Sequence, residues 1–154
     1  MVQPCRSKLS PGFTLIELLI AVGILGMLMA IAIPNVLSAQ QRSRYVQAAS
    51  DSKTAVSQGI VYSNEKNANP GTLKVLRESG YANISDTDPW ASPWVTSAAF
   101  ADSSTPATQG EMGVCSQGPR HTGDCTFPLP GPGESQPNGS VGYSSVYGAW
   151  QGSV

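Results

Sequence analysis

The most prominent feature of the sequence is a long apolar run near its N-terminus. Between Lys8 and Arg42 the only charged side chain is Glu17, and the residues up to Leu37 are otherwise apolar, small or uncharged. As a helix, the run after Gly12 would be about 36 Å long at ~1.5 Å per residue, enough to cross a bilayer core of roughly 30 Å. A carboxylate such as Glu17 costs about 3 kcal/mol at mid-membrane, so it requires a partner.

The apolar run gives way to an amphipathic pattern after Pro34. One face then carries apolar and small residues at helical spacing: Tyr45, Ala48, Ala49, Ser52, Ala55, Val56, Gly59 and Ile60. We therefore expect one helix whose first half contacts lipid or other helices and whose second half contacts its own head domain. We expect it to end near Asn64. Pro34 removes one backbone hydrogen bond, which predicts a bend or local melting of the helix.

The rest of the chain predicts short elements separated by turns. Residues 71–81 read as a short helix closed by Gly80. Over residues 141–150 the side chains alternate in character well enough to predict a closing strand. With 16 Gly and 12 Pro in 154 residues, we expect the part beyond the long helix to be rich in loops.

Composition and motifs argue against several functional classes. The net charge of -1 gives no basic surface for a nucleic acid. There is no nucleophile–base–acid set, no phosphate loop and no nucleotide fingerprint. The sequence therefore predicts a structural protein rather than an enzyme.

The segment Gly12-Phe13-Thr14-Leu15-Ile16-Glu17 resembles the cleavage and methylation signal of type IV pilins and type II secretion pseudopilins. The resemblance implies that a prepilin peptidase cuts between Gly12 and Phe13 and that Phe13 is then N-methylated. It also implies that Glu17 is the assembly carboxylate and that Pro34 marks a bend in the helix. The fold it implies is a pilin-like α+β fold, with the long N-terminal helix packed on a small antiparallel sheet.

The head also resembles that family, and most closely its major pseudopilins. Residues 88–94 (Asp-Pro-Trp-Ala-Ser-Pro-Trp) look like the Asp-Pro-Trp-Gly-x-Pro-aromatic turn of those proteins, with Ala91 in place of the usual Gly. A strand over residues 94–100 would follow this turn. Residues 112–119 resemble a later strand and Ser-x-Gly turn. We interpret the two tryptophans of the turn as core residues.

The cysteines predict a disulfide in an exported head. Cys5 lies in the leader, which leaves Cys115 and Cys125 as an even pair in an exported chain. A zinc site with His121 would lack a fourth ligand, so we predict no such metal site. Pseudopilin heads often bind calcium, which makes Asp124 and Glu134 weak calcium candidates, although solvated or turn-capping carboxylates are the simpler interpretation.

The resulting domain organisation has four parts. Residues 1–12 are a leader that is removed, 13–37 the transmembrane and assembly half of the helix, 38–65 its amphipathic half, and 66–154 the head. Positive residues in the leader predict a single-pass protein of the bacterial inner membrane, with its N-terminus cytoplasmic and its head periplasmic before it enters a filament.

The function that the resemblance implies is that of a filament subunit. We expect a type II secretion pseudopilin that polymerises with itself, with a prepilin peptidase/methyltransferase, the inner membrane and an inner-membrane assembly platform as partners. The alternative is a type IV pilus pilin for adhesion, twitching motility or DNA uptake. A further alternative is an ordinary secreted or membrane-anchored protein, for which the small-residue pattern at residues 30–32 would be a signal-peptidase site.

Overall fold

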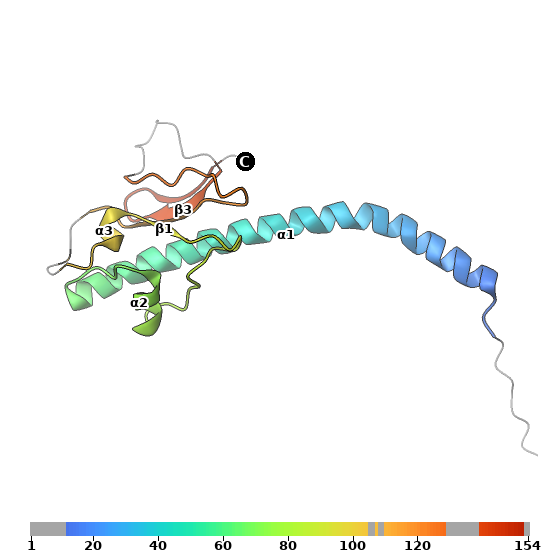
Figure 1. Cartoon of the computed structure of the whole chain (residues 1–154), viewed down its shortest axis with the longest axis horizontal. Coiled ribbons are helices and arrows are strands. Elements are labelled where there is room, and N and C mark those ends of the chain that lie inside the picture. Colours follow the sequence, from blue (N-terminus) through green and yellow to red (C-terminus); the bar gives the residue numbers. More distant parts are fainter. Residues whose placement is uncertain (1–11, 105–106, 108–109, 129–138, 153–154) are drawn as a thin grey trace, which may run out of the picture. The chain divides into compact units, whose positions relative to one another are not determined.

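The computed structural model describes residues 12–104, 107, 110–128 and 139–152. Its elements are α1 (Leu15–Lys66), α2 (Leu73–Glu78), β1 (Val95–Thr96), α3 (Ala98–Ala101), β2 (Gly113–Ser116), β3 (Val141–Ser144) and β4 (Gly148–Gln151) (Figure 1). Two compact units, residues 1–40 and 41–154, divide α1 between them, and each is described by itself.

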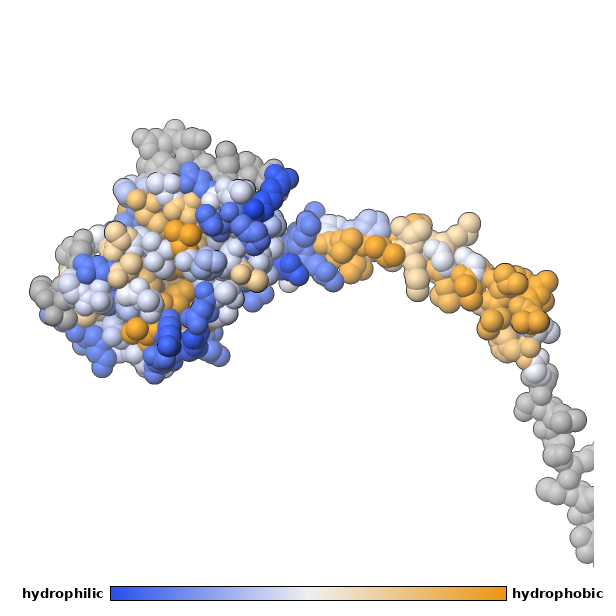
Figure 2. Space-filling model, viewed as in Figure 1, coloured by the Kyte–Doolittle hydropathy of each residue, from blue (hydrophilic) through white to orange (hydrophobic). Residues whose placement is uncertain are grey.

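The described part of the first unit is the apolar half of α1. All of its residues are exposed, and Figure 2 shows hydrophobic side chains along it. Among the described residues, α1 is the one helix long and apolar enough to cross a membrane. It continues unbroken through Pro34, where the Ser38 hydroxyl donates to the Pro34 carbonyl (2.7 Å) and the Asn35 side chain donates to the Ile31 carbonyl (3.2 Å). Local melting is therefore not seen, and a bend at Pro34 stays a prediction.

In the second unit, the amphipathic half of α1 packs on a four-stranded antiparallel sheet in the order β1-β2-β3-β4. The register pairs Thr96 with Val114, Gly113 with Ser144, and Ser144 with Gly148. This arrangement confirms the predicted pilin-like α+β fold.

Two buried clusters hold the sheet against α1. The larger joins helix α1, helix α2 and the sheet through Ala55, Val56, Leu73, Leu76, Ala82, Ile84, Phe100, Met112 and Val114. The smaller consists of Tyr45, Ala48 and Val141. A Cβ on Gly59 would lie 3.0 Å from the Phe100 ring, so the absence of a side chain there lets α1 approach the sheet closely. The buried face of α1 is the apolar face that the sequence predicted, except that Ile60 is exposed and Ala49 is half-buried.

Three local predictions need correction. The strand expected over residues 94–100 stops at Thr96, because the Ser97 hydroxyl caps α3 by accepting from the Phe100 N–H (3.3 Å). Residues 141–150 form the hairpin of β3 and β4 rather than one strand, because the chain turns after Ser144 and Gly148 has a positive φ of 81°. The helix α1 extends to Lys66, beyond the expected Asn64.

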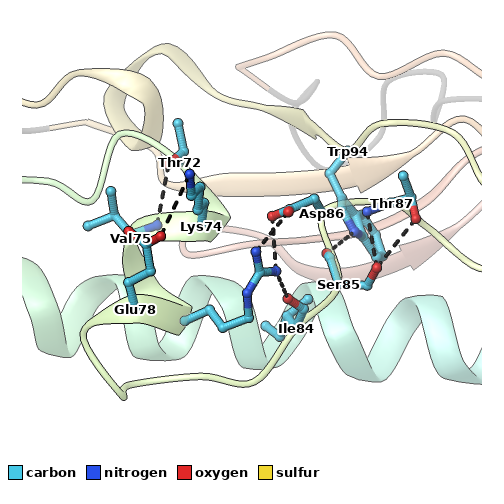
Figure 3. Close-up of polar contacts among 10 residues, drawn as sticks. Thr72, Lys74, Val75, Glu78, Ile84, Ser85, Asp86, Thr87 and Trp94 are labelled. Carbon is cyan, nitrogen blue, oxygen red and sulfur yellow. Dashed lines mark hydrogen bonds and ion pairs between the residues drawn. The ribbon is translucent and has the colours of Figure 1, made fainter.

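The loop between α2 and β1 is held by polar contacts (Figure 3). Arg77 donates to the Ile84 carbonyl (2.9 Å) and binds both carboxylate oxygens of Asp86 (3.1 and 2.8 Å). These hydrogen bonds hold the pKa of the Asp86 carboxyl below its usual value. Trp94 donates its ring N–H to the Ser85 carbonyl (3.1 Å), which fixes the end of the loop as the chain enters β1.

Candidate functional site

The predicted processing site lies just before α1. Gly12, Phe13 and Thr14 have no regular secondary structure, and α1 begins at Leu15. Apart from its chain neighbours, no described residue lies within 4 Å of the position that a Cβ on Gly12 would take, and the Phe13 side chain is 77% exposed. The Gly12–Phe13 peptide bond therefore lies outside the helical hydrogen-bond ladder and is open to another molecule.

Thr14 and Glu17 form a helix cap that the sequence interpretation missed. The Thr14 hydroxyl oxygen accepts from the Glu17 N–H (3.3 Å), and the hydroxyl lies 3.5 Å from the Glu17 carboxylate. Thr-x-x-Glu is the spacing of a capping box, so this signal was present in the sequence. The carboxylate also lies in the first turn, where the helix dipole favours a negative charge.

The Glu17 carboxylate forms no ion pair with any residue in the described part of this chain. In the uncut chain the nitrogen of Phe13 is an amide, so the α-ammonium group that a cut after Gly12 would create does not yet exist. The geometry therefore presents an exposed carboxylate, at the start of an apolar helix, without a cationic partner among the residues that the structure describes.

Cys115 and Cys125 form a disulfide with a Cα–Cα distance of 5.8 Å. The bridge ties the end of β2 to the following loop and leaves neither sulfur for a metal. His121 lies elsewhere: its Nδ1 contacts the Ser92 hydroxyl.

The calcium candidates are not brought together. Asp124 is exposed and accepts a hydrogen bond from the Thr126 hydroxyl, while Glu134 lies outside the described residues. Among the described residues, no group of three His, Cys, Asp or Glu side chains is placed to hold a metal ion.

Asp88 is the centre of the Asp-Pro-Trp turn. Its side chain is buried and accepts hydrogen bonds from the N–H groups of Trp90 (3.0 Å) and Ser92 (2.7 Å) and from the Ser116 hydroxyl. The carboxylate therefore joins the turn to the end of β2. The hydrogen bonds among the described residues do not join it to His121, so Ser92, His121 and Asp88 are not linked as in a hydrolase triad.

The same turn is packed against α1. The ring of Trp90 meets that of Tyr45 edge to face, with ring centroids 4.8 Å apart. Ala91 adopts a positive φ of 65° in this turn, the conformation that glycine favours. Trp90 and Trp94 are both half-buried and pack against the buried clusters, so the interpretation of the two tryptophans as core residues is confirmed only in part.

Comparison with known proteins agrees with the motif and the fold. Residues 8–33 match the family described as the prokaryotic N-terminal methylation motif. The long apolar helix and the small antiparallel sheet have the pilin-like arrangement, and the match identifies a prepilin-type methylation motif at the start of the chain.

A more particular relative is the type II secretion system core protein G of Pseudomonas aeruginosa. The two are 29% identical over 99 residues, covering 54% of this chain and 70% of the relative. The chain is homologous to this protein. No solved structure gives a significant match. Pilins and pseudopilins are structural proteins rather than enzymes, which agrees with the interpretation of the sequence.

Proposed function

We propose that the chain is a pseudopilin, a subunit that assembles into the filament of a type II secretion system. The observation that carries the proposal is the similarity to core protein G, combined with the methylation motif at residues 8–33. The relative is named as a secretion component, which favours the secretion filament over the pilus alternative.

Processing would convert the chain into the form that assembles. A prepilin peptidase would cut between Gly12 and Phe13, and Phe13 would then be N-methylated. The exposed, non-helical backbone at residues 12–14 supports this step, because a peptidase needs access to an extended peptide bond. Cleavage would create an α-ammonium group close to Glu17.

The new ammonium is the partner that Glu17 requires. A buried carboxylate is tolerated when paired with a cation and strongly unfavourable when left alone. We infer that the terminal ammonium of one subunit meets Glu17 of the next, which would set the stagger between neighbouring helices. In the uncut chain Glu17 is exposed and forms no ion pair with a described residue, which is consistent with a partner that arrives from outside.

The membrane arrangement follows from the same helix. Arg6 and Lys8 of the leader would stay on the cytoplasmic side, and the head would lie in the periplasm. The partners would then be further copies of the chain, the prepilin peptidase/methyltransferase and the inner-membrane assembly platform. The head would act by packing, without catalysis and with no resident cofactor.

The test compares Glu17→Gln with Glu17→Asp in cells that contain the secretion machinery. Glu17→Gln keeps the side-chain volume but removes the charge, so we expect normal cleavage, a mature N-terminus at Phe13 and loss of sheared filaments and of protein export. Glu17→Asp keeps the charge and should retain part of the assembly.

N-terminal sequencing separates processing from assembly in the same samples. A mature chain that begins at Ile33 would indicate an ordinary secretory signal, and one that still begins at Met1 would indicate no processing. Normal filaments from Glu17→Gln would contradict the ion-pair proposal.

A further inference from the structure

The turn between β3 and β4 exposes two apolar side chains on a well-fixed backbone. Val146 is 61% exposed and Tyr147 is 46% exposed. The Ser144 hydroxyl oxygen accepts from the N–H groups of both residues (3.1 and 3.4 Å). Because Ser145 also exchanges hydrogen bonds with the Met112 backbone (2.8 and 3.0 Å), the turn is held on both sides.

Two carboxylates lie at the same end of the sheet as this turn. Glu111 accepts a hydrogen bond from the Ser144 hydroxyl and shares a surface cleft with Asp102. We call Asp102, Glu111, Val146 and Tyr147 the acidic tip. It lies at the end of the sheet where β2 begins and β3 ends, since Gly113 pairs with Ser144.

The opposite end of the sheet is basic. Helix α1 runs along the sheet from Tyr45, which packs on Val141 at the start of β3, to Gly59, which faces Met112 before β2. Near the Tyr45 end lie Arg42, Arg44 and Arg120, all exposed and without an ion pair to any residue that the structure describes. The Tyr45 end also includes the loop of Arg120, because Gly118 approaches the Tyr45 hydroxyl.

An exposed apolar side chain lies beside one of these cations. Val46 is 70% exposed and follows Arg42 by four residues, which places both on one face of the helix. We call Arg42, Arg44, Val46 and Arg120 the basic end. The side chains of the acidic tip and of the basic end thus combine exposed apolar atoms with charges of opposite sign, while Lys66 in the last turn of α1 and the exposed Asp124 add one charge of the other sign near each end.

We propose that the acidic tip of one copy docks on the basic end of the next copy. Charge complementarity identifies the partner, since the surface that fits the acidic tip is present on the same chain. Val46 would meet Val146 and Tyr147, while the arginines would face Glu111 and Asp102. A contact between two different surfaces propagates instead of closing into a dimer, which is what a filament requires. The inference rests on the proposed function and adds the head-to-head contact to it.

Cross-linking in assembled filaments tests the contact directly. Full-length chains carrying Val46→Cys and Val146→Cys are expressed separately and together, and intact filaments are treated with a short bismaleimide. Cys115 and Cys125 stay bridged, and Cys5 leaves with the leader. We expect a covalent dimer only when both variants are co-expressed.

Every other result counts against the contact. A dimer formed by Val146→Cys alone would indicate a two-fold contact between tips. Intact filaments that never cross-link in the mixed sample would overturn the docking while leaving the proposed function in place. If the unmodified chain forms no filament in cells that secrete normally, the proposed function itself fails, and the docking fails with it.

Charge reversal gives a second test with a matched control. Arg42→Glu places an acid on the basic end, whereas Lys53→Glu makes the same change of charge at an exposed position of α1 between the two ends. We expect Arg42→Glu to lower the assembled fraction on the order of tenfold, because like charges would then face each other across the contact. Lys53→Glu should assemble normally. Equal loss in both variants, with equal amounts of processed subunit in the membrane, would overturn the proposal.

Discussion

The buried carboxylate of Asp88 offers the clearest test of how the head is held together. It is 4% exposed and accepts three hydrogen bonds: two from the N–H groups of Trp90 and Ser92 and one from the Ser116 hydroxyl. Hydrogen bonds to a charged group contribute about 1.5–3 kcal/mol each, and they are not additive. Asp88→Ala would also leave three buried donors without an acceptor, so we expect it to lower the free energy of unfolding by about 4 kcal/mol.

Asp88→Asn measures the contribution of the carboxylate charge to stability while keeping the geometry of the hydrogen bonds. The amide oxygen can still accept from the two N–H groups, and the amide nitrogen can donate to the Ser116 hydroxyl after that hydroxyl rotates. Only the contribution of the charge is lost, so we expect a decrease of roughly 1–2 kcal/mol. Asp86→Asn is the matched control, because this exposed carboxylate lies two residues away and should change stability much less.

The assay is urea unfolding of the full chain in detergent, followed by tryptophan fluorescence and fitted with a common slope. Trp90 contacts the turn directly, so the signal reports on this part of the head. If Asp88→Ala and Asp86→Asn shifted the midpoint equally, the turn would not depend on the buried carboxylate and our account of it would be wrong.

Three further outcomes are expected. Replacing both Cys115 and Cys125 by Ala should lower stability by about 3 kcal/mol, because the closed loop between them is short; an unchanged urea midpoint, with intact mass confirming the bridge in the parent chain, would contradict this. Ala91→Gly should raise stability by about 0.5–1 kcal/mol, because the positive φ is strained for alanine and free for glycine; a lower urea midpoint would show that the strain is absent. The hydrogen bond to Glu65 raises the pKa of Tyr81 above its usual value near 10, so this contact stabilises the fold below pH 10 and is lost as the pH rises through the raised pKa. NMR titration of labelled tyrosine should show that pKa falling back in Glu65→Gln, and no change would refute the contact.

Periodicity predicted the long helix and its buried face because these depend on spacing within one segment. Tyr45, Ala48, Ala55 and Val56 recur at helical intervals, and they are the residues that pack on the sheet or its loops. The helix cap at Thr14 could have been predicted in the same way, from the Thr-x-x-Glu spacing, but the sequence analysis missed it. Local patterns of this kind need no knowledge of the tertiary structure.

The ends of the strands could not be predicted because side chains from distant positions decide them. A strand from Trp94 to Phe100 is reasonable on propensity, but the Ser97 hydroxyl accepts from the N–H groups of both Phe100 and Gly113 and starts a helical turn instead. The role of Asp88 depends on Ser116, which lies 28 residues further along the chain. No pattern within either segment reveals such a contact.

These polar contacts connect stability to the proposed assembly surfaces. Strands β2 and β3 have four residues each and end at Ser116 and Ser144. Ser116 binds Asp88 near the basic end, and Ser144 binds Glu111 at the acidic tip, so each end of the sheet is fixed by a buried hydroxyl. A small apolar core alone would hold these ends weakly, whereas a filament contact requires surfaces that keep their shape. It follows that Asp88→Asn should leave the head folded and still reduce cross-linking between copies, because it loosens the surface before it unfolds the domain.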